Sequence, residues 1–100
     1  MFAVTIDVPE PIELYDSYVG ALLERTGGAV DGLLVQFARR TEAGFRVVEV
    51  WASHDEFERY GREIAEPLAA EILRGRPHPQ EEVSEFDVRG LVLPRAGVVV

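Results

Sequence analysis

The first apolar pattern of the chain has the two-residue period of a β-strand. Over residues 2–8 apolar side chains occupy alternate positions, so we expect a strand there. Pro9 and Pro11 prevent its continuation, and Pro11 suits the first turn of a helix. From Ile12 to Arg25 the apolar residues recur at helical spacing, and the pair Gly27-Gly28 predicts the end of that helix.

The middle of the chain predicts two further strands joined by a hairpin. The first covers residues 33–38, with Leu33, Val35 and Phe37 facing one way. Residues 41–44 supply the connection, and residues 45–52 form the next strand. One side of that strand carries Phe45, Val47, Glu49 and Trp51.

The remaining third of the chain predicts a second helix and a fourth strand. Ser53 followed by Glu56 is a capping box, so the helix begins there. Pro67 predicts a kink or a restart within it, because proline removes a hydrogen bond and crowds the preceding turn. Residues 75–82 read as a loop, and residues 83–93 hold the fourth strand. The buried stripe of the helix is Phe57, Tyr60, Ile64 and Leu68.

This order of elements, βαββαβ, predicts an α+β domain of the ferredoxin-like class. We expect a four-stranded antiparallel sheet with two helices on one face. A chain of 100 residues has the length of a single domain, so we assign residues 1–100 to one. No internal repeat divides it.

The second face of the sheet and the C-terminal segment predict self-association. Two helices cover one face only, and neither side of the predicted strands is convincingly polar. Residues 91–100 are also too apolar for a loose tail. Covering a second copy of the chain would bury both surfaces; the alternative is that the tail packs on its own subunit.

Composition excludes several classes of partner. The net charge is −8, there is no lysine, and the arginines are scattered, so nucleic-acid binding is not expected. There is no cysteine for disulfides or thiolate zinc sites. The N-terminal residues do not read as a signal peptide, and no apolar run is long enough to span a membrane. We therefore expect a cytoplasmic protein whose partners are itself and a small molecule.

The stretch VVEVWASHDEFERY, residues 47–60, resembles the dimeric α/β-barrel superfamily, which includes the antibiotic-biosynthesis-monooxygenase-like proteins. That group shows an apolar strand ending in Glu-x-Trp, here Glu49 and Trp51. A serine at the helix cap follows, here Ser53, with an aromatic residue or histidine nine positions after the tryptophan, here Tyr60. The resemblance implies a homodimer whose two sheets face each other. It also implies a pocket in each subunit between the helices and the sheet.

The haem-degrading branch of that superfamily differs from this chain at its functional positions. The branch has a tryptophan where this chain has Tyr60, and an iron-binding histidine where the ungapped position here is Ala70. An asparagine of its first strand is replaced in the region of Thr5 and Asp7. We therefore expect no haem. His54 and His78 lack any metal-binding spacing, so we expect no metal ion and no cofactor.

Three residues are candidates for catalysis. Tyr60 lies on the apolar stripe of the second helix, where its hydroxyl either finds a core partner or meets a substrate oxygen. Glu49 shares a strand face with Trp51. If that face meets the helices, burial raises the pKa of Glu49 and makes it a candidate base; if it faces the dimer seam, Glu49 pairs with Arg39 or Arg46. His54 is either a general base or an exposed first-turn residue.

Five residues are candidates for substrate binding, each with core packing as the alternative: Trp51, Tyr15, Tyr18, Gln36 and Phe57. Gln36, with Asp7, is a polar residue within a strand that lines either the cavity or the dimer seam. His78 falls in the 75–82 loop, where we expect an exposed role.

These observations support two hypotheses of function. The first is a small-molecule enzyme of the cofactor-independent monooxygenase or polyketide cyclase/isomerase type, which abstracts a proton from an aromatic or enolisable metabolite. The second is a non-catalytic ligand-binding or accessory homodimer of the same fold. A cavity of at least ~300 Å³ would favour an enzyme or a binder, and a filled core would favour a structural role.

Overall fold

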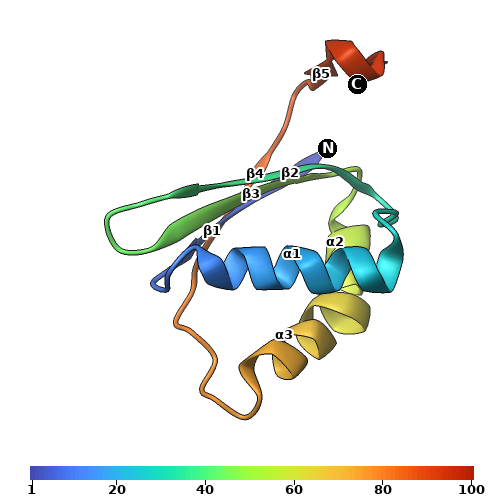
Figure 1. The fold of residues 1–100 in the computed structure, drawn as a ribbon. Coiled ribbons are helices and arrows are strands. Elements are labelled where there is room, and N and C mark those ends of the chain that lie inside the picture. Colours follow the sequence, from blue (N-terminus) through green and yellow to red (C-terminus); the bar gives the residue numbers. More distant parts are fainter.

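The computed structural model describes residues 1–100 and contains the predicted four-stranded antiparallel sheet. Its strands are β1 (Phe2–Val8), β2 (Leu33–Arg40), β3 (Phe45–Trp51) and β4 (Glu82–Asp87). They lie in the order β2-β3-β1-β4, so the first and third strands pair at the centre (Figure 1). This is the ferredoxin-like arrangement, and the βαββαβ prediction is confirmed.

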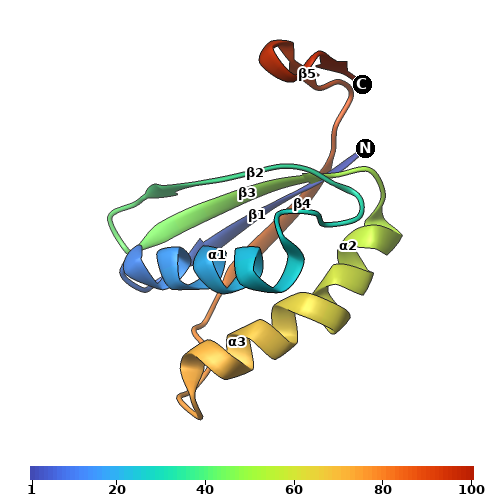
Figure 2. The same ribbon diagram turned by 45° about the vertical axis from the view of Figure 1, so that its right-hand side comes forward.

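The helices cover one face of the sheet, as predicted. They are α1 (Glu13–Thr26), α2 (His54–Tyr60), the π-helical turn η1 (Gly61–Ala65) and α3 (Glu66–Leu73). All of them lie below the sheet in both views (Figures 1 and 2). Gly27 ends α1 with a φ of 67°, a left-handed conformation that glycine adopts without a steric penalty. Ser53 caps α2 by accepting a hydrogen bond from the Glu56 backbone N–H.

Of the two predictions at Pro67, a kink or a restart, the structure shows the restart: a new α-helix, α3, begins at Glu66 with Pro67 in its first turn. The segments α2, η1 and α3 follow one another without a break and form one helical stretch, visible in Figure 2. Between α2 and α3 the backbone widens into the π turn over residues 61–65, where the Glu66 N–H donates to the Gly61 carbonyl. Pro67 lies directly after this turn, in the first turn of α3, where its missing N–H is tolerated.

A β-bulge in β2 overturns the predicted alternation of that strand. Leu33 pairs with Trp51, but Val35 pairs with Val50, so an extra residue is inserted between Leu33 and Val35. Leu33 and Val35 therefore face opposite sides of the sheet, not the same side. The consequence is that Gln36, opposite Glu49, faces the helices.

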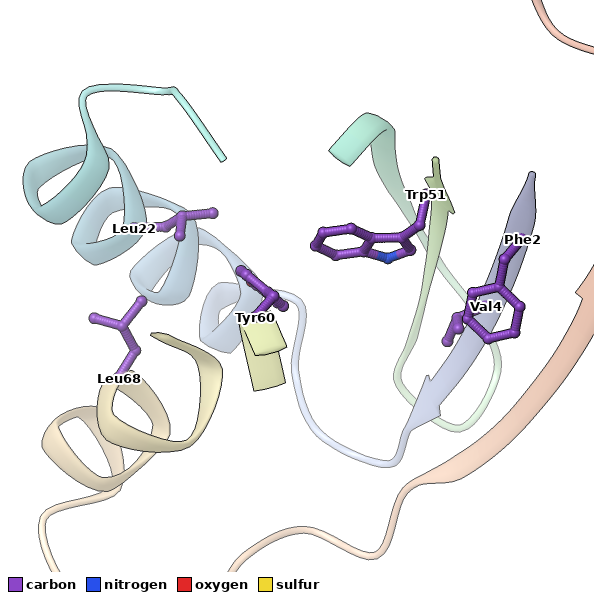
Figure 3. Close-up of a cluster of buried hydrophobic side chains, with 6 residues drawn as sticks. All are labelled: Phe2, Val4, Leu22, Trp51, Tyr60 and Leu68. Atoms are coloured by element: carbon purple, nitrogen blue, oxygen red, sulfur yellow. The ribbon is translucent and has the colours of Figure 1, made fainter. Parts of the chain in front are cut away.

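The main core lies between the sheet and the helices. Phe2 and Val4 of β1 and Trp51 of β3 reach toward the helices, where they meet Leu22, Tyr60 and Leu68 (Figure 3). A second cluster of Val8, Phe45 and Val47 fills the opposite end of the same face. The polar member of the buried set is Glu49, which is 3% exposed.

The opposite face of the sheet is partly apolar and carries one ion pair. Phe37 and Phe86 are 53% and 49% exposed there. On the same face Arg46 donates from Nε and Nη2 to the two carboxylate oxygens of Asp7, at 2.7 and 3.0 Å. This hydrogen-bonded pair lowers the pKa of Asp7. Arg46 therefore pairs with Asp7, and Asp7 lies away from the helices.

The predicted fourth strand ends earlier than expected. It stops at Asp87, and the apolar C-terminal residues form a small separate hairpin from β5 (Val92–Leu93), a 3₁₀ turn (Pro94–Ala96) and β6 (Val98–Val99). This hairpin projects beyond the sheet, on the side away from the helices (Figures 1 and 2). Val92, Val99 and Val100 are all more than half exposed. None of the helices has the length and apolarity required to cross a membrane.

Candidate functional site

A cavity of about 380 Å³ lies between the sheet and the helices. Of its 21 lining residues, 14 are hydrophobic. The lining residues belong to all four strands of the sheet, to α1, to the helical stretch 54–73 and to the loop that follows it. Cavities that hold small molecules begin at roughly 300 Å³ and are mostly apolar with a few polar groups. The core on this face is therefore not filled by its own side chains.

The most buried polar group in this cavity is the carboxylate of Glu49. Its two oxygens each accept one hydrogen bond, Oε1 from the Trp51 indole N–H at 3.2 Å and Oε2 from the Gln36 amide at 2.7 Å. Burial raises the pKa of Glu49, and the two hydrogen bonds oppose that rise. The carboxylate is thus held in one orientation with an increased affinity for a proton.

Gln36 connects Glu49 to Tyr15 on the first helix. The Tyr15 hydroxyl donates to the Gln36 Oε1 at 3.0 Å, and the Gln36 amide nitrogen donates to Glu49. The ionised Glu49 carboxylate can only accept, so the Gln36 amide nitrogen must face Glu49 and its oxygen faces the Tyr15 hydroxyl. Burial raises the pKa of Tyr15, and the nearby charge of Glu49 adds to the rise.

Tyr18 of α1 and Tyr60 of α2 meet through their hydroxyl groups beside the same cavity. Burial raises the pKa of Tyr18 to about 12 and raises that of Tyr60 well above its usual range. Both phenols therefore stay protonated. One hydroxyl proton is used between the two oxygens, which leaves the other available to a ligand.

Trp51 supports the cavity without lining it. Its side chain is fully buried, with its ring 4.9 Å from that of Tyr60 and 5.8 Å from that of Phe57. Its N–H is committed to Glu49. Trp51 therefore positions the carboxylate and the Tyr60 ring, and Phe57 lines the cavity in its place.

The structure places His54 outside the cavity. It is exposed at the start of α2, with its ring against that of Phe2 at 4.8 Å. Possible metal-binding atoms of His54, Asp55 and Glu58 lie within 4.8 Å of one another, and all three residues are exposed. Exposed acidic groups at a helix start are common without an ion, so this cluster is not part of the site.

Six of the candidate residues thus meet at one cavity, and two do not line it. The six are Tyr60, Glu49, Tyr15, Tyr18, Gln36 and Phe57. Sequence reasoning missed the floor formed by Ile6, Val8, Phe45 and Val47, although strand alternation places them on this face. It also missed the exposed residues at the opening, Glu66, His78 and Glu81, which we call the mouth. No local sequence signal brings residues 78 and 81 of a loop to this position.

No sequence-family model matches the chain, and no curated protein matches it. Solved structures do match. A monooxygenase from the gene ActVA-Orf6 of Streptomyces coelicolor, in complex with nanaomycin D, is 20% identical with a TM-score of 0.64, over 93% of this chain and 91% of that one. SnoaB, a cofactor-independent oxygenase from Streptomyces nogalater, is 22% identical with a TM-score of 0.55, over 93% and 94%.

The haem degrader MhuD from Mycobacterium tuberculosis, with two haems in its active site, also matches. It is 19% identical with a TM-score of 0.60, over 92% of this chain and 99% of that one. At these identities the likeness concerns the fold. The chain has the ferredoxin-like fold of the antibiotic-biosynthesis-monooxygenase-like proteins, as its sequence predicted.

The lining residues do not fit a haem. Haem carries two carboxylates, and no lysine or arginine lines the cavity to pair with them. Its one lining histidine, His78, is exposed at the mouth, and Ala70 is exposed on α3.

Proposed function

We propose that the protein is a small-molecule enzyme of the cofactor-independent monooxygenase or cyclase/isomerase type, acting on an aromatic or enolisable metabolite. The observation that carries this proposal is the buried Glu49 carboxylate at an apolar cavity that also holds the Tyr18–Tyr60 pair. A base and a hydroxyl donor beside one largely apolar cavity are groups that can abstract a proton from a phenol or enol and stabilise the resulting charge.

Glu49 is the proposed base. Its raised pKa brings its proton affinity closer to that of an acidic phenol or enol, which makes proton transfer less unfavourable. The hydrogen bonds from Trp51 and Gln36 hold each oxygen on one side and leave further lone pairs for the substrate proton. Trp51 and Gln36 act as positioning residues in this scheme.

The Tyr18–Tyr60 pair is the proposed donor to the substrate oxygen. As the proton leaves, negative charge develops on that oxygen, and the free hydroxyl proton of the pair stabilises it. Because both tyrosines have raised pKa values, neither gives up its proton to the solvent at neutral pH.

The enolate formed in this way has two proposed fates. Its carbon adds to molecular oxygen, and the resulting hydroperoxide loses water to leave a new carbonyl group. Alternatively, the same carbon attacks an electrophile within the substrate and closes a ring. Both fates share the proton abstraction by Glu49 and need no metal from the protein.

The active form is proposed to be a homodimer in the cytoplasm. The exposed Phe37 and Phe86 on the open face of the sheet give each subunit an apolar surface to bury against a second copy. The projecting hairpin of residues 91–100 supplies a further apolar contact. The absence of cysteine is compatible with a reducing compartment.

Ligand binding without catalysis is the second candidate function. It is favoured by the cavity itself, since an apolar cavity with few polar groups serves a binder as well as an enzyme. A purely structural role would have predicted a filled core at this place. The two functions differ in whether the chemistry depends on Glu49 and Tyr60.

Oxygen uptake with an anthrone tests the proposal. An anthrone is a tricyclic ketone whose enol is aromatic, and the assay is run with chelator and without added cofactor. We expect saturable uptake that falls by ~10²-fold in Glu49→Gln and Tyr60→Phe. Glu71→Gln, an exposed acid of α3 outside the cavity, is the matched control and keeps the activity. Saturable binding without protein-dependent turnover would establish the binder.

A further inference from the structure

The cavity lining carries acids and no permanently cationic side chain. Glu49, Glu66 and Glu81 are among its 21 lining residues, whereas lysine and arginine are absent from them. Glu49 is buried at the floor, and Glu66 and Glu81 are exposed at the mouth. A carboxylate or phosphate on a ligand would therefore find no lysine or arginine among the lining residues to neutralise its charge.

The surface next to the mouth does not neutralise the negative charge of these glutamates. A neighbouring cleft shares His78 with the cavity and contains Arg76, Glu10 and Glu13. The Arg76 guanidinium donates from Nε to the Leu73 carbonyl at 3.0 Å and from Nη2 to the Ile72 carbonyl at 3.3 Å. Its orientation is therefore fixed by the end of α3, and two glutamates accompany it in the cleft.

The charge at the mouth reaches the interior of the cavity. The negative charge of Glu81 contributes to the raised pKa of both Glu49 and Tyr18. A positive group placed near the mouth would be stabilised by the same field. Glu81, which lies between the loop and the edge strand β4, thus affects the pKa values of two groups that are proposed to take part in the reaction.

The apolar part of the lining is rich in aromatic rings. Tyr15, Tyr18, Phe45, Phe57 and Tyr60 all contribute to it. Aromatic faces attract organic cations as well as flat apolar groups, most strongly where water is excluded. Carboxylates at the opening of an aromatic-lined cavity are complementary to a ligand that is apolar at one end and cationic at the other.

We infer that the ligand of this cavity is an aromatic molecule that bears a protonated amine. Its ring system enters the cavity, and its ammonium group lies at the mouth in the field of Glu66 and Glu81. This inference rests on the proposed function in one respect, that the cavity takes a ligand. It adds the charge of that ligand, which neither proton abstraction nor the fold specifies.

Three probes with the same ring system and polar groups of similar size test the inference: naphthylmethylamine, naphthylmethanol and naphthoate. Binding to the full-length protein at neutral pH is followed by the fluorescence of Trp51, the single tryptophan of the chain. We expect the ammonium to bind about 10-fold more tightly than the carboxylate, with the alcohol between them, as two partly screened charge interactions would give. Added salt reduces the difference.

A charge-matched pair of variants assigns the effect to the mouth. Glu66→Gln combined with Glu81→Gln removes two charges there, and Glu24→Gln combined with Glu71→Gln removes two from exposed helix positions outside the cavity. We expect the first pair to abolish most of the preference for the amine over the alcohol, and the second pair to retain it.

The outcomes separate this inference from the proposed function. Equal binding of the three probes, or tighter binding of naphthoate, overturns the inference about charge and leaves the cavity as a ligand site. An equal loss of preference in both pairs of variants attributes it to net charge and also overturns the inference. Failure of all three probes to bind overturns both proposals, because the cavity would then take no aromatic ligand.

Discussion

The hydroxyl groups of Tyr18 and Tyr60, 42 residues apart in the chain, are in direct hydrogen-bonding contact between the first helix and the end of the second. Neither side chain has another hydrogen-bond partner within the protein. Only one of the two hydroxyl protons is needed for this hydrogen bond, so the other can be donated to a ligand in the cavity. This pair connects the packing of the two helices with the proposed donation to substrate.

The pair predicts non-additive effects of removing the two hydroxyls. Tyr60→Phe keeps the ring against Trp51 and should lower the free energy of unfolding by about 1 kcal/mol. Tyr18→Phe should do the same, and the double variant should cost less than the sum, because both singles break one contact. Chemical denaturation of the four proteins measures this cycle. Strict additivity would show that the hydroxyls do not interact in solution.

Glu49 predicts a pH-dependent stability. Because its folded pKa lies above its ordinary value of 4.5, its contribution is fully present below that pH and is lost as the pH rises through the raised pKa. Relative to Glu49→Gln, the protein should lose about 1.4 kcal/mol for each pH unit between the two pKa values. Melting temperatures of both proteins from acidic to neutral pH provide the measurement. Parallel curves would mean that Glu49 titrates normally.

Gly44 and Gly20 predict opposite responses to the same substitution. A Cβ at Gly44 would lie 2.2 Å from the Val8 carbonyl oxygen, so Gly44→Ala should destabilise the hairpin by at least ~1 kcal/mol. A Cβ at Gly20, within α1, meets nothing within 4 Å. Gly20→Ala should therefore stabilise the protein by roughly 0.5–1 kcal/mol. Thermal unfolding of the two variants is the test, and equal signs would contradict the close approach at Gly44.

The C-terminal hairpin predicts a weaker dimer after truncation. Deleting residues 95–100 removes β6 and so dismantles the hairpin. If the hairpin contacts the second subunit, the dissociation constant of the proposed dimer should rise by 10-fold or more, which corresponds to a loss of about 1.4 kcal/mol of binding free energy. Leu23→Ser, which removes an exposed apolar residue from α1, is the control. Sedimentation equilibrium measures both constants. An unchanged constant would place the hairpin outside the subunit interface.

The sequence predicted the elements and their order because each one has a local signal. The alternation of residues 2–8, the Ser53–Glu56 capping box and the glycine at position 27 all lead to the observed boundaries within a residue or so. The face of Glu49 could only be stated as an alternative, since strand alternation groups residues without saying which group meets the helices. The structure places that face against the helices.

The parts that the sequence did not predict depend on contacts between distant segments. The bulge falls within the apolar run Leu33-Leu34-Val35, which contains no glycine or proline, yet it brings Gln36 to the same side as Glu49. The π turn absorbs Pro67 by a change of hydrogen bonding that helical periodicity does not reveal. His78 and Glu81 reach the mouth only because the loop returns from α3 to β4. Composition alone gives none of these relationships.

Proton exchange at an enolisable carbon tests the central claim, that Glu49 abstracts a proton from a ligand in this cavity. The anthrone is incubated with the protein in deuterated buffer without oxygen, and the loss of its methylene proton signal is followed by NMR. The account predicts exchange faster than in buffer alone, falling by ~10²-fold in Glu49→Gln and unchanged in Glu71→Gln. Exchange no faster than in buffer, or equally fast in the Glu49 variant, would contradict it.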